Sequence, residues 1–108
     1  MAWTRKEILN AADECVNGSR DHNYGTPENN FTTVASFWNT YISAKNGGSY
    51  DFPLLYAHDV AAMLALLKLA RISSGQGKTD NWIDLAGYAA CGGEVEEIWR
   101  GEQLKTFS

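Results

Sequence analysis

The sequence is poor in cysteine, proline and positive charge, and each scarcity excludes a class of protein. Its 108 residues include two Cys and two Pro, and nine Lys plus Arg stand against thirteen Asp plus Glu, for a formal net charge of −4. Cys15 and Cys91 have neither C-x-x-C spacing nor a flanking His, which disfavours a zinc site. Because no basic run is present, binding to nucleic acid is also disfavoured.

Long hydrophobic runs are absent as well. The longest uninterrupted apolar stretch covers residues 60–67 and ends at Lys68, so it is far too short to cross a bilayer. The residues after Met1 lack the apolar segment and the cleavage site of a secretion signal. We therefore predict a protein that does not enter membranes and resides in the cytoplasm.

Large aromatic rings, in contrast, are abundant. Four Trp, five Tyr and four Phe are more large rings than one small domain easily covers, so we predict a homo-oligomer, either a dimer or a higher assembly. Hydrophobic residues make up 44% and charged residues 20% of the chain, the composition of a folded globular domain. The length favours a single domain over residues 1–108.

Helical periodicity and capping signals predict an all-α bundle. Thr4 and Glu7 fit a capping box at the start of a first helix, and Pro27 is typical of a first helical position. The third helix is apolar on nearly every side, which places it at the centre of a bundle or at a subunit interface. Glycines 87, 92 and 93 inside the last helix predict close helix approach or a kink. The predicted helices cover residues 4–17, 27–45, 57–73 and 80–99, and a fraying tail covers 101–108.

A polar loop leads into the second helix. Arg20 and Tyr24 precede Pro27, and Asn30 follows in the first helical turn. The free N–H groups and the positive dipole end of a helix N-terminus favour an anion, so these side chains are candidate ligand-binding residues. The alternative is that the loop only caps the helix.

Two cations lie in the most apolar helix. Lys68 and Arg71 are three residues apart and share a helix face. Because cations are rarely buried without a partner, we predict either a pocket for a phosphate or carboxylate, or ion pairs with Asp80 and Asp84 of the next helix. The two interpretations are compatible, since carboxylates often orient the cations of an anion site.

Carboxylates provide the candidate metal ligands. Asp80, Asp84 and Tyr88 follow one another at four-residue steps along one ridge of the last helix, and Asp59 stands at the head of the apolar helix. Oxygen ligands of this kind suit Mg²⁺. The alternative for Asp59 is that it only complements the helix dipole.

The motifs together resemble a family of small proteins encoded by bacteriophages and prophages, over about residues 5 to 97. This family in turn resembles, distantly, the MazG-like all-α nucleotide pyrophosphohydrolases. The resemblance implies a helical bundle that dimerises in a bacterial cytoplasm, and Mg²⁺-dependent cleavage of a nucleoside triphosphate to monophosphate and pyrophosphate. The motifs that carry it are Arg20-x-x-x-Tyr24-Gly25-x-Pro27-x-x-Asn30-Phe31, Trp38, Asp59-Val60-Ala61, Lys68-Leu69-Ala70-Arg71 and Asp80-Asn81-Trp82-Ile83-Asp84-Leu85-Ala86-Gly87-Tyr88.

The metal ligands of the MazG-like group are only partly present. If the helices correspond, the motif Glu-x-x-Glu falls on Lys68-x-x-Arg71 and the motif Glu-x-x-Asp falls on Asn81-x-x-Asp84, so that Asp84 alone matches. Two functions follow as hypotheses. One is a nucleotide-binding protein that is a divergent or degenerate pyrophosphohydrolase, and the other is a non-enzymatic module that sequesters a nucleotide or blocks a host protein. The candidate residues are Asp80 and Asp84 for catalysis, Asp59, Asp80 and Asp84 for Mg²⁺, and Arg20, Tyr24, Asn30, Lys68, Arg71 and Tyr88 for the ligand.

Overall fold

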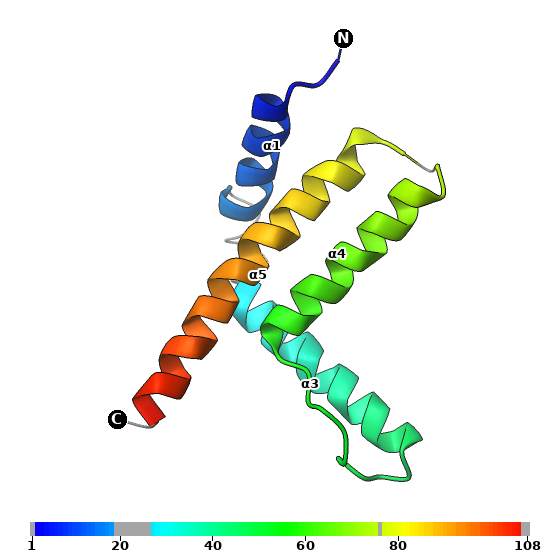
Figure 1. Ribbon diagram of the computed structural model, residues 1–108, viewed down its shortest axis with the longest axis vertical. Coiled ribbons are helices and arrows are strands. Elements are labelled where there is room, and N and C mark those ends of the chain that lie inside the picture. Colours follow the sequence, from blue (N-terminus) through cyan, green and yellow to red (C-terminus); the bar gives the residue numbers. More distant parts are fainter. Residues whose placement is uncertain (1, 19–26, 76, 107–108) are drawn as a thin grey trace.

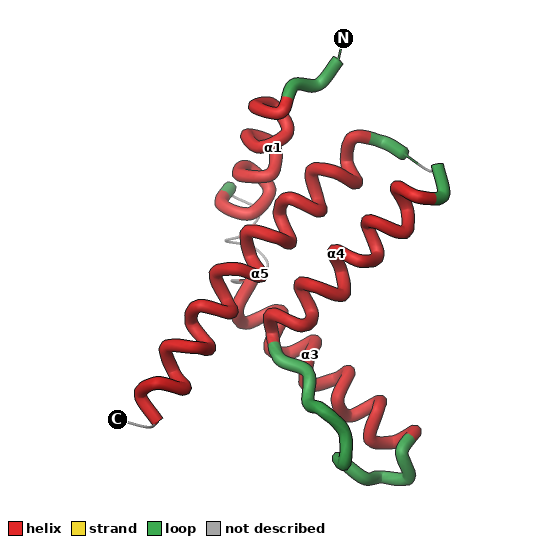
Figure 2. Tube along the Cα trace, viewed as in Figure 1, coloured by secondary structure: helices red, strands yellow, loops and turns green. Residues whose placement is uncertain are grey.

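The chain folds into helices joined by loops (Figures 1 and 2). A computed structural model describes residues 2–18, 27–75 and 77–106, and within these ranges it contains no strand. The all-α class predicted from the sequence is therefore confirmed. The helices are α1 (Arg5–Asn17), α3 (Pro27–Lys45), α4 (Ala57–Ser73) and α5 (Thr79–Thr106).

The helix bounds agree closely with the predictions except at the end of α5. The predicted tail over residues 101–108 is wrong for residues 101–106, which continue the helix. Gly101 costs only about 1 kcal/mol in a helix, and the Glu-Gln-Leu-Lys segment that follows consists of good helix formers. An i,i+4 ion pair of 2.8 Å between Arg100 and Glu96 adds support one turn earlier.

Local hydrogen bonds start two of the helices. At α1, the backbone N–H of Glu7 donates to the Thr4 hydroxyl oxygen at 3.1 Å, and the Thr4 N–H donates to Glu7 Oε1 at 3.1 Å, which confirms the predicted capping box. Donation from the backbone and the hydroxyl of Thr4 holds the pKa of Glu7 below its ordinary value. At α4, the Tyr56 N–H donates to Asp59 Oδ2 at 2.8 Å.

Helices α4 and α5 form an antiparallel hairpin, and the other helices pack against it (Figure 1). α1 lies along the first half of α5, and α3 crosses near the start of α4. Two of the four glycines inside α5 mark close contacts. A Cβ on Gly92 would lie 3.0 Å from the Ala61 Cβ in α4, and a Cβ on Gly87 would lie 3.3 Å from Val16 Cγ1 in α1. The predicted close approach of helices is confirmed at these two positions.

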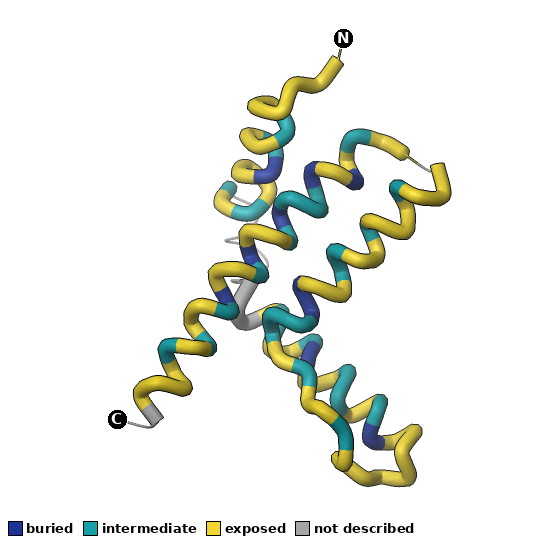
Figure 3. The backbone as a smooth tube through the Cα atoms, in the orientation of Figure 1, coloured by how far each residue is buried: buried dark blue, intermediate teal, exposed yellow. Residues whose placement is uncertain are grey.

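The core of this arrangement is thin. Among the described residues, Val60 is the largest fully buried side chain, and buried positions cluster where the helices meet (Figure 3). The radius of gyration is 16.1 Å, whereas a compact domain of this length has about 13 Å. Much of the apolar surface of the chain therefore remains exposed. None of the helices in the described ranges combines the length and the apolar character needed to span a membrane.

Candidate aromatic ligand site

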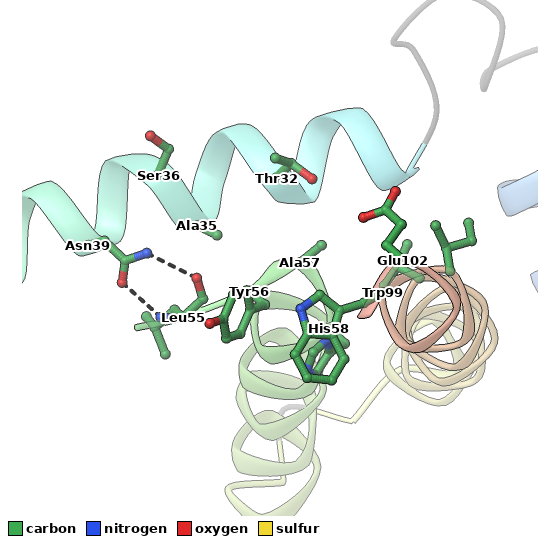
Figure 4. A pocket seen from close by; sticks show the side chains of 12 residues that line it. Thr32, Ala35, Ser36, Asn39, Leu55, Tyr56, Ala57, His58, Trp99 and Glu102 are labelled. Carbon is green, nitrogen blue, oxygen red and sulfur yellow. Dashed lines mark hydrogen bonds between the residues drawn. The ribbon is translucent and has the colours of Figure 1, made fainter. Parts of the chain in front are cut away.

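A cavity opens where α3, the start of α4 and the second half of α5 meet (Figure 4). We call it the aromatic cavity. Its volume is about 350 Å³, within the range of small-molecule sites. Three rings contribute to its wall, two from the start of α4 and one from α5. The described lining residues are Thr32, Ala35, Ser36, Asn39, Leu55, Tyr56, Ala57, His58, Val95, Ile98, Trp99 and Glu102.

The three rings form one cluster. The centroid of Tyr56 lies 5.9 Å from that of His58 and 5.3 Å from that of Trp99, and the centroids of His58 and Trp99 are 5.2 Å apart. The planes of Tyr56 and His58 differ by 13°, whereas Trp99 is tilted against both. Separations of this size are typical of attractive ring contacts. The cluster therefore forms an aromatic part of the cavity wall.

The side chain of Asn39 fixes the loop that carries this wall. Its Nδ2 donates to the Leu55 carbonyl oxygen at 2.9 Å, and its Oδ1 accepts from the Leu55 N–H at 2.9 Å (Figure 4). An amide side chain thus pairs with a backbone peptide group as a neighbouring strand would. Since Tyr56 follows directly, this pair sets where the ring of Tyr56 enters the cavity.

The imidazole of His58 includes a buried nitrogen that lacks a hydrogen bond in the described part of the chain. Its Nδ1 is buried and has no hydrogen-bond partner among the described residues, and its Nε2 lies 4.0 Å from Asp59 Oδ2. His58 also borders a second groove of about 240 Å³ between α4 and α5, which includes Tyr88 and Glu96 among small alanine and glycine residues. The imidazole of His58 therefore lines both the aromatic cavity and this second groove.

Positive charge is absent from the described lining residues of the aromatic cavity. Among its described lining residues, Glu102 is acidic and none is Lys or Arg. Asp59 lies one residue beyond His58 and is half-buried. The described lining therefore offers no cation that could hold several phosphates.

The predicted pairing of Lys68 with Asp84 is confirmed. Lys68 Nζ lies 3.0 Å from Asp84 Oδ2, and the Lys68 side chain is only 12% exposed. Arg71 and Asp80 are both exposed. Lys68 stands ten residues after His58 in α4, which corresponds to about 15 Å along the helix axis. The ion pair and the aromatic cavity are therefore separate places on the α4–α5 hairpin.

The three predicted metal ligands do not come together. In residues 2–18, 27–75 and 77–106, no group of three or more His, Cys, Asp or Glu is placed to hold a metal ion. Asp59 caps α4, and Asp84 is engaged by Lys68. Nine residues of helix, about 14 Å, separate Asp59 from Lys68. The prediction that Asp59, Asp80 and Asp84 form one Mg²⁺ site is therefore a poor fit to the fold, and the dipole alternative for Asp59 agrees with its hydrogen bond.

The remaining candidate residues are scattered. Arg20 and Tyr24 lie outside the described residues. Asn30 is exposed in the first turn of α3 and has a bonding partner of its own. Tyr88 lines the second groove and lies one helical turn after Asp84 in α5. The sequence also predicts that one polar pocket gathers six side chains, those of Arg20, Tyr24, Lys68, Arg71, Asp80 and Asp84. Among the described members of this set, Lys68 contacts Asp84, whereas Arg71 and Asp80 are exposed.

The sequence did not point to the residues of the aromatic cavity. Tyr56, His58 and Trp99 carry no motif, and 41 residues separate His58 from Trp99. The one available signal is Asp59. An acidic residue three positions after Tyr56 favours a helix start at Tyr56, and this start determines the directions in which the rings of Tyr56 and His58 project. The contact with Trp99 depends on the packing of α5 and has no local signal.

Comparisons with known proteins place this chain in a family. Residues 7–96 match the model of a family described as a domain of unknown function, DUF6378. The chain belongs to the DUF6378 family. It is 32% identical over 94 residues to the Gene 55 protein of Mycobacterium phage D29, covering 87% of this chain and 54% of the relative. It is 37% identical over 82 residues to the Gene 55 protein of Mycobacterium phage L5, covering 76% of this chain and 47% of the relative.

These matches confirm the predicted likeness to a family of phage proteins. This DUF6378 chain spans about half the length of the two curated relatives. No solved structure matches the chain. The matching region includes α4 and the part of α5 up to residue 96. The ion pair falls inside the family domain, and so do most lining residues of the aromatic cavity, whereas Ile98, Trp99 and Glu102 lie beyond it.

Proposed function

We propose that this DUF6378 chain binds a nucleoside or nucleotide, and that the base enters the aromatic cavity. One observation carries the proposal: Tyr56, His58 and Trp99 line a cavity of about 350 Å³ between three helices. The cavity has the size of a small-ligand site and combines apolar walls with a few polar groups. This proposal assigns nucleotide binding to the aromatic cavity and not to the polar pocket predicted from the sequence.

The rings supply the binding energy for a planar ligand. Stacking a base on an aromatic side chain contributes about 1–3 kcal/mol. Tyr56 is 43% exposed, so a flat ligand has ring surface available to it. Because the cluster is already formed, little ordering of side chains opposes binding.

The charges determine which part of a nucleotide this site recognises. No Lys or Arg is among the described lining residues of the cavity, so no cation is placed there to bind several phosphates. Lys68, the buried cation predicted to contact phosphate, is held by Asp84 and lies about 15 Å further along α4. We therefore expect nucleosides and monophosphates to bind better than triphosphates.

The proposal includes no hydrolytic step. Cleavage of a nucleoside triphosphate in the MazG-like manner requires carboxylates that bind Mg²⁺ beside the phosphates. Asp84 faces Lys68 at 3.0 Å, and Asp59 caps its own helix. A non-enzymatic interaction role is the second candidate, and the exposed apolar surface of α4 favours it.

Thermal unfolding with added ligands tests the proposal. A ligand at a hundred times its dissociation constant adds about 2.7 kcal/mol, roughly 10 °C or more in a domain of this size. The panel comprises the common nucleosides, their monophosphates and their triphosphates, each with and without Mg²⁺. Stabilisation by a nucleoside without Mg²⁺ supports the proposal. If no member of the panel raises the unfolding temperature, the proposal is wrong.

A pair of tryptophan variants locates the site. Trp99→Leu removes the ring in the cavity wall, and Trp82→Leu removes a half-exposed ring of the same helix that does not line the cavity. Trp99→Leu should abolish the stabilisation by ligand, and Trp82→Leu should preserve it. Trp99→Phe keeps an aromatic wall and should retain part of the affinity. Far-UV circular dichroism shows whether each variant is folded.

A further inference from the structure

The last part of α5 extends beyond the other helices. In Figure 1 the C-terminal end of this helix continues past the start of α4 and away from α1. Val95 is buried, whereas none of the residues from 96 to 105 is buried (Figure 3). We call residues 97–106 the terminal segment. Because helix ends with few buried contacts open locally at a low free energy, we expect the terminal segment to be the least stable part of α5.

The contacts of the terminal segment lead to the aromatic cavity. Ile98, Trp99 and Glu102 line this cavity. The Trp99 ring contacts the rings of Tyr56 and His58 at the start of α4, with centroid distances of 5.3 and 5.2 Å. One wall of the aromatic cavity therefore exists only while the terminal segment is helical and lies beside α3 and α4.

The sequence of the terminal segment weakens its helix. Gly101 lies within it, and glycine is the poorest helix former after proline. A Cβ at this position would meet no packed neighbour within 4 Å, so close packing does not require the glycine. The match to the family model ends at residue 96. The terminal segment therefore extends the matched domain, and it can unwind while the α4–α5 hairpin stays folded.

We infer that the terminal segment closes the aromatic cavity over a bound ligand, so that ligand binding and helix formation in this segment are coupled. This inference rests on the proposed function. A base that contacts Trp99 together with α3 and α4 binds to the helical form of the segment. Such a ligand shifts the segment toward the helix. Because the coupling is reciprocal, unwinding of the segment weakens ligand binding by the same factor.

Two substitutions at Gly101 test the coupling, because this residue does not line the cavity. Gly101→Pro interrupts the helix of the terminal segment and leaves Trp99 in the chain, whereas Gly101→Ala favours the helix. The probes are adenosine, guanosine, cytidine and uridine, titrated by intrinsic tryptophan fluorescence. Gly101→Pro should raise the dissociation constant at least about tenfold. Gly101→Ala should leave it unchanged or lower it, by about fivefold at most.

Failure of this inference is distinguishable from failure of the proposed function. If Gly101→Pro binds a nucleoside as tightly as the unaltered protein does, the inference is wrong and the proposed function stands. If the unaltered protein binds none of the four nucleosides, the proposed function is wrong and the inference falls with it. Far-UV circular dichroism and urea unfolding show whether the rest of the chain is folded in Gly101→Pro.

Hydrogen exchange tests the coupling in the unaltered protein, without a proline in the helix. Amide exchange of residues 99–103 is followed by NMR in the absence of a nucleoside and at about a hundred times its dissociation constant. Linkage lowers the opening constant about 100-fold at that concentration, so exchange should slow by about tenfold to 100-fold. Unchanged exchange with a nucleoside bound overturns the inference, even if Gly101→Pro fails to fold.

A comparison without any nucleoside tests the role of Trp99 in holding the terminal segment. Trp99→Leu removes the ring contacts with α4, and Trp82→Leu removes a ring of α5 that lies outside the terminal segment. The amides of residues 99–103 should exchange faster in Trp99→Leu than in Trp82→Leu. Equal exchange in the two variants would contradict the inference, because the terminal segment would then be held independently of the cavity wall.

Discussion

Removing the carboxylate of Asp84 should destabilise the hairpin of α4 and α5. The Lys68 side chain is 12% exposed and that of Asp84 is 39% exposed, with 3.0 Å between Nζ and Oδ2. Breaking a fully buried pair costs about 3–5 kcal/mol because one charge stays behind, and an exposed pair contributes about 0.2–1 kcal/mol. For this half-buried pair we expect Asp84→Asn to cost about 1–3 kcal/mol, or roughly 5–15 °C in unfolding temperature.

The assay is urea unfolding followed by far-UV circular dichroism. All variants are measured at one protein concentration, so that any self-association affects their free energies of unfolding equally. Asp80→Asn is the matched control, because Asp80 lies one turn earlier in the same helix and is exposed. Its carboxylate lies in the first turn of α5, so the substitution should lower the free energy of unfolding by at most about 1 kcal/mol. Replacing both partners, Lys68→Met with Asp84→Leu, should recover most of the loss. If Asp84→Asn costs no more than Asp80→Asn, Lys68 is not held by its partner and the reasoning fails.

Three further predictions concern single positions. Asn39→Ala removes both hydrogen bonds to the loop before α4 and should cost about 1–3 kcal/mol, with faster amide exchange at residue 55. Gly92→Leu should destabilise by about 1–3 kcal/mol because a Cβ there already lies 3.0 Å from α4, whereas Gly93→Leu meets open space and should unfold at the same urea concentration or higher. The lowered pKa of Glu7 beside Thr4 gives a stabilisation that is present above about pH 4.5 and declines as the pH falls through the folded pKa. The stability difference between the unaltered protein and Glu7→Gln should therefore narrow from pH 7 to pH 3.

The helices could be predicted from the sequence because their signals are local. Thr4 and Glu7 form their capping box within one turn, and the fixed φ of Pro27 suits a first helical position. The end of α5 could not be predicted as well. Gly101 suggested a stop, but the modest local cost of one glycine is exceeded by the helix formers around it.

The site was less predictable because it depends on tertiary packing. Lys68 and Asp84 each conflicted with the apolar or ordinary capping pattern of their helices, and this conflict correctly indicated their pairing. The aromatic residues of the cavity do not conflict with the local sequence pattern. Tyr56 directly precedes α4, and Trp99 is an ordinary apolar residue of α5. Their ring contact arises only when α5 folds back antiparallel along α4, and periodicity does not specify which residues then face each other.

Titration of the intrinsic tryptophan fluorescence with nucleosides, for the unaltered protein beside Trp99→Leu and Trp82→Leu, tests the central claim most directly. The account predicts saturable quenching by at least one nucleoside in the unaltered protein and in Trp82→Leu, and loss of this quenching in Trp99→Leu. It also predicts weaker binding of the matching triphosphate, because no Lys or Arg is among the described lining residues. Binding of the triphosphate in preference to the nucleoside, with unchanged affinity in Trp99→Leu, would contradict the assignment of the aromatic cavity.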